Sequence, residues 1–453
     1  LFIKNYYHIL IIKISNLKVI YIMKFFKITI TSILFILFLF NISVFADELK
    51  VYSTYTANNL TITSYSKNWS KSMLKDLYLE LLNNFHSDEF DYLSNIYIYP
   101  DSPEGVNGLY YDDIFLENGK YKLGNNAYIN LYNGDENNTI RKISYTLSHE
   151  YGHHYMVYNL MKTENIYYHN LQDSKYVKIR NLNGTPVIYD ATKKDYLYHW
   201  DIMEIMADDY VQLLGSSNAK MSYDYKSVDE ILKENTTPYN NPNSFNLKPQ
   251  LNPYIPLAAD ISGLYNYLLN IGGFTVASPK IPEKPKLNNV TGYMSLNNEP
   301  TYNITWNNPN KNEVFEYTLV IYPENNPFVA YPLKTVTSKE PLNVIFGSYS
   351  IKQKDGTIKS ISQIYEGKYT LKLYIKDSNG FMYSSTPVTY NFTQLSNNIT
   401  SNNTKSSNTK SNDTTKTNNV VNDNKPSATP DSKPIGPSSS GSLNDLFYLV
   451  SKS

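Results

Sequence analysis

The chain has 453 residues, which is enough for two or three domains. Its 41 Lys and Arg residues balance 41 Asp and Glu residues, so no net charge recruits nucleic acid or an anionic membrane surface. Cysteine is absent, which excludes disulfides, thiolate nucleophiles and Cys-ligated zinc. Any metal that the protein binds must therefore use His, Asp or Glu.

The N-terminal region has the pattern of a secretory signal. Residues 1–22 precede Met23 and are interpreted as an over-extended reading frame. Residues 23–46 place lysines before a long apolar run, as in a signal peptide, and Val44 and Ala46 supply the small residues expected before a cleavage site. An uncleaved anchor is the alternative, since the apolar run approaches spanning length. We expect cleavage, no stable membrane span afterwards, and a protein that is secreted or displayed on a bacterial cell surface.

The next segment, residues 47–277, mixes short strands with amphipathic helices. Alternating apolar residues predict strands over 60–66, 95–101 and 126–135. Apolar residues at helical spacing predict helices over 72–85, 139–161, 199–217 and 258–269. This mixture predicts an α+β domain.

The C-terminal part changes character at a Pro-rich linker, residues 278–286. Residues 287–394 contain alternating runs that predict about seven short strands, typical of an all-β sandwich. Residues 395–453 are rich in Asn, Ser, Thr and Lys, and this composition predicts a disordered tail.

The motif "SHEYGHHY", residues 148–155, carries the strongest chemical signal. His149 and His153 are four positions apart, so on a helix both project from one face and can grip one metal ion. Glu150 would sit beside the metal without binding it, where it can take a proton from water. His154 is rotated by about 100° from His153, which makes it an unfavourable ligand. A solvated polar helix face is the alternative interpretation.

A hydrolytic zinc site needs a third protein ligand. The metzincin extension would require Gly and His where the chain has Met156 and Asn159, so that class is excluded. In "EIMAD", Glu204 and Asp208 again share one helical face, so one carboxylate can bind metal while the other holds a ligand imidazole. Glu204 could instead belong to a capping box that starts at Asp201.

Two histidines outside the motif, His169 and His199, are competing ligands or substrate contacts.

The spacing of these two motifs resembles that of gluzincins, the thermolysin-like zinc peptidases. The resemblance implies a zincin-like catalytic domain in which His149, His153 and Glu204 bind Zn²⁺ and Glu150 is the general base. It also implies that Asp208 accepts a hydrogen bond from His149, with Asp209 as the fallback.

By the same resemblance, "NAYINLYNG" at residues 126–134 would be the edge strand that lines the substrate cleft. A downstream residue would stabilise the oxyanion, and Tyr254, Tyr265 and His199 stay open for that role. The β-sandwich segment resembles fibronectin type III and Ig-like modules, which leaves its ligand undefined.

The sequence therefore predicts a secreted zinc endopeptidase that acts on peptide or protein substrates. The sandwich would contact a cell-surface or matrix ligand. One alternative is a surface adhesion protein in which the zinc site is structural or degenerate. Another is a zinc hydrolase that acts on a substrate other than a peptide.

Overall fold

A computed structural model describes residues 49–392, except 103–104, 190–195, 222–249, 278, 295–299, 325–326, 329, 353–354 and 363–366. The predictions for the reading frame, the signal peptide and the tail concern residues 1–22, 23–46 and 395–453, and they lie outside the described residues. Within the described ranges, no helix combines the length and the apolar character needed to cross a bilayer.

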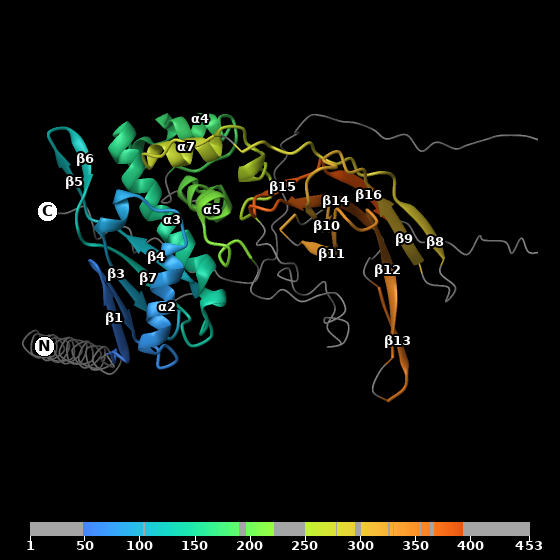
Figure 1. The fold of residues 1–453 in the computed structure, drawn as a ribbon, viewed down its shortest axis with the longest axis horizontal. Coiled ribbons are helices and arrows are strands. Elements are labelled where there is room, and N and C mark those ends of the chain that lie inside the picture. The colour runs from blue at the N-terminus through green and yellow to red at the C-terminus, as the bar shows by residue number, and fades with distance from the viewer. Residues whose placement is uncertain are drawn as a thin grey trace, which may run out of the picture. The chain divides into compact units, whose positions relative to one another are not determined.

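A five-stranded sheet organises the first part of the chain (Figure 1). Its strand order is β1-β2-β3-β7-β4, with the bounds β1 Ser53–Ala57, β2 Leu60–Ser64, β3 Leu93–Ile98, β7 Ala127–Leu131 and β4 Gly108–Tyr111. The three central strands are parallel, whereas β1 and β4 pair antiparallel with their neighbours. Ile96, Ile98 and Ile129 are fully buried on one face, which matches the alternating pattern of the sequence.

The prediction that residues 126–134 form an edge strand is wrong. The segment 126–134 contains β7, which lies inside the sheet between β3 and β4. The edge next to β7 is β4, a four-residue strand in the Gly- and Asp-rich stretch that carries no alternation long enough to predict a strand. A separate hairpin, β5 (Ile114–Glu117) and β6 (Lys120–Leu123), follows it.

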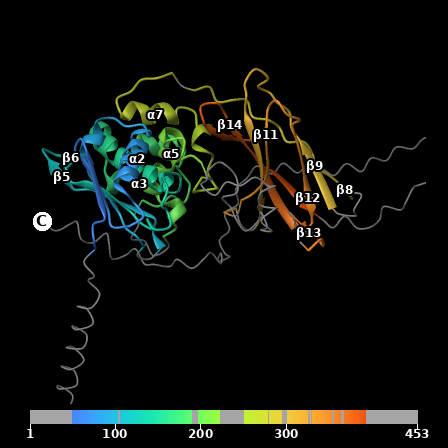
Figure 2. The ribbon, with the colours of Figure 1, turned by 60° about the horizontal axis from the view of Figure 1, so that its bottom comes forward.

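The helices gather on one side of this sheet (Figures 1 and 2). They are α2 (Lys71–Leu82), α3 (Ile140–Glu164), α4 (Lys175–Ile179), α5 (Ile202–Leu214) and α7 (Leu264–Ile271), with 3₁₀ turns at Asp88–Tyr92, Tyr168–Asp173, Tyr198–Trp200 and Ala258–Asp260. The Thr139 hydroxyl caps the N-terminus of α3, and Asn165 ends it in the left-handed conformation. The sequence did not predict the short helix α4.

Helices α3 and α5 approach each other closely because small residues face each other at their contact. A Cβ atom on Gly152 of α3 would lie 3.0 Å from the carbonyl oxygen of Ala207 on α5. Gly152 precedes His153, and Ala207 lies three positions after Glu204. The glycine therefore lets the two helices approach each other next to the predicted ligands His153 and Glu204.

The C-terminal strands form two antiparallel sheets. One has the order β11-β10-β14-β15, with β16 also paired to β14, and the other has the order β13-β12-β9-β8. Their bounds are β8 Thr291–Met294, β9 Pro300–Thr305, β10 Glu316–Pro323, β11 Tyr331–Thr337, β12 Asn343–Lys352, β13 Ile358–Ser362, β14 Gly367–Lys376, β15 Met382–Ser384 and β16 Val388–Phe392. Strands β8 and β15 are too short for alternation to reveal, which explains why the sequence predicted only about seven.

Candidate metal centre

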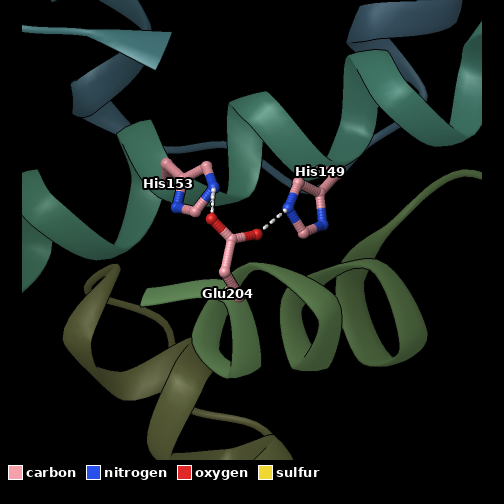
Figure 3. A group of neighbouring side chains, drawn as sticks. All are labelled: His149, His153 and Glu204. Carbon is pink, nitrogen blue, oxygen red and sulfur yellow. Dashed lines mark hydrogen bonds and ion pairs between the residues drawn. The ribbon is translucent and has the colours of Figure 1, made fainter. Parts of the chain in front are cut away.

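Helices α3 and α5 bring His149, His153 and Glu204 together (Figure 3). The Glu204 carboxylate lies between the two imidazole rings. Its Oε2 is 2.9 Å from Nε2 of His149, and its Oε1 is 3.8 Å from Nε2 of His153. One ligand atom from each residue lies within 4.8 Å of the other two. The sequence therefore selected the three side chains that meet here.

The donor set fits zinc. Two imidazole nitrogens and one carboxylate oxygen are ligands that zinc accepts, and three protein ligands leave one coordination position open. His149 is 5% exposed and His153 is 8% exposed, so water competes little for these nitrogens. Burying an anion against two imidazoles is costly unless a cation or a proton balances the charge.

In the absence of a metal, His149 and Glu204 shift each other's pKa in opposite directions. Burial lowers the pKa of His149, but the hydrogen bond to Glu204 and the Glu204 charge outweigh it and raise that pKa to about 9. Burial raises the pKa of Glu204, but the two histidines outweigh it and lower that pKa to about 2. A metal ion bound here would have to displace any proton that His149 carries, because a metal ligand must be deprotonated.

Glu150 lies beside the cluster without belonging to it. Its side chain is buried at 6% exposure, and burial raises its pKa to about 8, with a further contribution from the Glu204 charge. The backbone N–H of Tyr110, on the edge strand β4, donates a hydrogen bond to this carboxylate and opposes the rise of its pKa. Glu150 is therefore oriented by the sheet as well as by its own helix.

Asp208 does not make the expected contact. Its Oδ1 accepts a hydrogen bond from the Tyr145 hydroxyl at 3.2 Å, and its Oδ2 accepts from Gln212 and from the Leu251 amide, each at 3.0 Å. Nδ1 of His149 is buried and has no hydrogen-bond partner among the described residues. Asp208 hydrogen-bonds Tyr145 instead, and the Tyr145 ring stacks on the His149 imidazole with the two ring centroids 5.8 Å apart.

Asp209, the fallback for Asp208 as the acceptor from a histidine, is already engaged. Its carboxylate accepts from Nε of Arg180 at 2.7 Å, from Nη2 of Arg180 at 3.2 Å and from the Tyr176 hydroxyl at 2.6 Å. These side chains are buried, and Asp209 is not part of the metal-ligand cluster. Asp209 therefore has a structural role.

The remaining histidines are held elsewhere. His154 is fully buried, with Nε2 2.7 Å from the carbonyl oxygen of Glu89 and Nδ1 3.1 Å from the Tyr110 hydroxyl. His169 contacts tyrosine rings, and His199 contacts neighbouring aromatic rings. None of the three belongs to the described cluster.

The capping alternative for Glu204 belongs to Asp201 alone. The Asp201 carboxylate caps α5 by accepting from the Met203 amide at 2.8 Å, whereas Glu204 turns towards the histidines. Two of the candidates for carbonyl stabilisation contact aromatic side chains. Tyr254 stacks on Trp200 at 5.9 Å, and Tyr265 contacts Phe381 at 5.1 Å.

Sequence reasoning missed one residue of this centre, Tyr198. Its hydroxyl hydrogen-bonds the Glu204 carboxylate, and burial together with the Glu204 charge raises its pKa well above the ordinary value. The side chain is still 46% exposed, so it borders the centre and the solvent. Tyr198 lies in a 3₁₀ turn just before α5, where no periodicity marks it. Its position six residues before Glu204 of "EIMAD" is the one feature of the sequence that could have indicated it.

No protein-family model and no curated protein matches the chain. Among solved structures, it is 9% identical to OgpA of Akkermansia muciniphila over 66% of this chain and 64% of that one, with a TM-score of 0.20. It is 10% identical to the pectate lyase PelI of Erwinia chrysanthemi over 24% and 28%, with a TM-score of 0.16. It is 15% identical to BC0361, a polysaccharide deacetylase of Bacillus cereus, over 24% and 30%, with a TM-score of 0.15. The chain thus spans less than a third of the pectate lyase and of the deacetylase, and the low scores assign no fold.

Proposed function

We propose that residues 47–277 form a gluzincin-like zinc endopeptidase domain of a secreted or cell-surface protein. One observation carries the proposal: one ligand atom each from His149, His153 and Glu204 lies within 4.8 Å of the other two in a largely buried site. A polar helix face that is merely solvated would be exposed and would not meet a carboxylate from a second helix.

Each residue has a role in the proposed hydrolysis. A bound zinc ion supplies a Lewis acid that polarises the scissile carbonyl and makes water more acidic. The Glu150 carboxylate accepts a proton from the attacking water and passes it to the leaving amine nitrogen. Burial raises the pKa of Glu150 above that of an exposed glutamate, which makes its carboxylate a stronger base once it is ionised.

Tyr198 is a further candidate for carbonyl stabilisation. Its hydroxyl reaches Glu204 and remains partly exposed, so it can donate to an oxygen held beside the metal.

The edge strand β4 supports a peptide as substrate. One side of β4 pairs with β7, and the other side has no strand partner in the described sheet. An extended peptide can add to such an edge through main-chain hydrogen bonds. Because Tyr110 on β4 contacts both Glu150 and the His153 ring, a peptide on this edge would run past the metal centre.

The remainder of the chain fits this proposal as a targeting and attachment system. Residues 23–46 would direct export, and the β-sandwich over 287–394 would hold the enzyme near a cell-surface or matrix ligand.

The central test replaces Glu150 by Gln in the exported chain. We expect one zinc ion per chain, measured by plasma mass spectrometry, in both wild type and E150Q, because Glu150 is not a ligand. Cleavage of unfolded casein should fall by about 10²- to 10⁴-fold, the usual contribution of a general base. Exposed Glu117 gives the matched control E117Q, which should retain wild-type activity.

Two outcomes would contradict the proposal. Substantial cleavage by a clean E150Q preparation would remove Glu150 as the base. A wild-type chain that binds zinc but cleaves no peptide would favour an adhesion protein or a hydrolase with another substrate.

A further inference from the structure

The position of the Glu150 carboxylate depends on a residue of the sheet. A Cβ atom built on Gly108 of β4 would lie 2.5 Å from Oε1 of Glu150 and 2.7 Å from its Cγ. These separations are far shorter than ordinary van der Waals contact, so any side chain at this position must displace the carboxylate. Gly108 is not in the left-handed region, so its backbone would tolerate alanine.

The backbone of β4 also orients Glu150. The Tyr132 amide donates to the Asn107 carbonyl oxygen at 2.9 Å, and Gly108 is paired with Leu131 in the same antiparallel ladder. Hydrogen-bonded and non-hydrogen-bonded pairs alternate in such a ladder, so the polar groups of Gly108 and Tyr110 point away from β7. This direction agrees with the donation from the Tyr110 N–H to the Glu150 carboxylate.

We propose that Gly108 is a positioning residue for catalysis: its missing side chain forms the notch in which Glu150 seats, held there by the Tyr110 amide. This inference rests on the role proposed above for Glu150 as the general base. The notch fixes the carboxylate at the edge strand, where the substrate peptide would also lie. Gly108 does not bind the metal.

A purely structural role for Gly108 has to be separated from this one. The same Cβ atom would lie 2.7 Å from Cγ2 of Thr146, which is on α3 one turn before Glu150. Alanine at position 108 could therefore push the whole helix away instead of moving one carboxylate. The two effects predict different behaviour when the Thr146 methyl group is removed.

The first experiment measures G108A as the full zinc-loaded protein. We expect kcat to fall by about 10- to 100-fold, since a displacement of about 1 Å at a catalytic group costs this much. KM should stay within about twofold of wild type, and zinc should remain at one ion per chain. An unchanged kcat, or a raised KM with normal kcat, would overturn the proposal, because the second result marks a substrate contact.

Two further variants separate positioning from packing. In G108A/T146S the helix contact is relieved while the contact with Glu150 persists, so thermal stability should recover and kcat should stay low. Recovery of kcat together with stability would show that Gly108 serves only helix packing. The matched control is G134A, whose Cβ would meet Cγ2 of Ile98 at 2.6 Å. It should lose stability and keep kcat within about twofold.

Crystal structures of zinc-loaded wild type and G108A give a readout that does not require activity. We expect the Glu150 carboxylate to move while His149, His153 and Glu204 keep their positions. If the wild type proves inactive on peptides, the proposed function fails, yet the carboxylate shift still tests the notch. An unmoved carboxylate in G108A would refute the notch even in an active enzyme.

Discussion

Helix α5 carries two acidic residues, Asp209 and Glu204, whose surroundings differ sharply. Asp209 meets Arg180, a fixed cation, and the pair is completed by the Tyr176 hydroxyl. Glu204 meets two imidazoles, His149 and His153, neither of which carries a permanent charge. Five positions of one helix therefore separate a carboxylate with its own counter-ion from one that depends on a proton or a metal.

The difference shows that the partners of a shielded carboxylate decide how its charge is balanced. An Arg–Asp pair with two hydrogen bonds compensates the cost of burial internally. A Glu between two histidines has no such built-in counter-ion, so its charge is compensated only when a proton or a metal ion binds. The stability of this part of the fold therefore depends on the pH and on the metal concentration. The Asp209 side chain is 1% exposed and the Glu204 side chain is 16% exposed, so both are largely shielded from solvent and the main difference between them is the partner.

Breaking the Arg180–Asp209 pair should have the largest effect on folding. In R180M the Asp209 charge remains buried without a counter-ion, and we expect a loss of about 3–5 kcal/mol in the free energy of unfolding. Denaturant titration of the zinc-loaded protein measures it. The exposed pair Lys162–Asp88 gives the control, since K162M should cost no more than about 1 kcal/mol. Equal losses in the two variants would contradict the contrast.

Zinc binding at His149, His153 and Glu204 should stabilise the fold by less than the Arg180–Asp209 pair does. At a free zinc concentration of about 100 Kd, mass action adds about 2.7 kcal/mol to the free energy of unfolding. We expect this gain in wild type and its loss in H153Q, measured by thermal or denaturant unfolding with and without a chelator. A zinc-dependent gain that persists in H153Q would place the metal elsewhere.

The smallest effect should come from Asp208. A carboxylate that directly holds a metal-bound histidine typically contributes about 10- to 100-fold in metal affinity. Because Asp208 bonds Tyr145, Gln212 and the Leu251 amide instead, we expect D208N to lower zinc affinity by less than about tenfold. Competition with a chromogenic chelator measures it. A larger loss would show that Asp208 turns to His149 when zinc binds.

The sequence by itself determined the chemistry of the proposed site. The spacing of His149 and His153 fixes two donors on one helical face, and helical periodicity likewise places Glu204 on the α5 segment. These are local properties, because a helix of known period sets the relative directions of side chains four positions apart. The caps of α3 and the alternation in β3 are local in the same sense.

Only the tertiary structure decided which partners these residues meet. The strand order places β4, and not β7, at the edge next to Glu150. Only this arrangement shows that Gly108 lies against the Glu150 side chain. Asp208 and Asp209 are neighbours in the sequence, yet one joins Tyr145 and the other Arg180. Such contacts join segments far apart in the chain, and they depend on packing that no local pattern encodes.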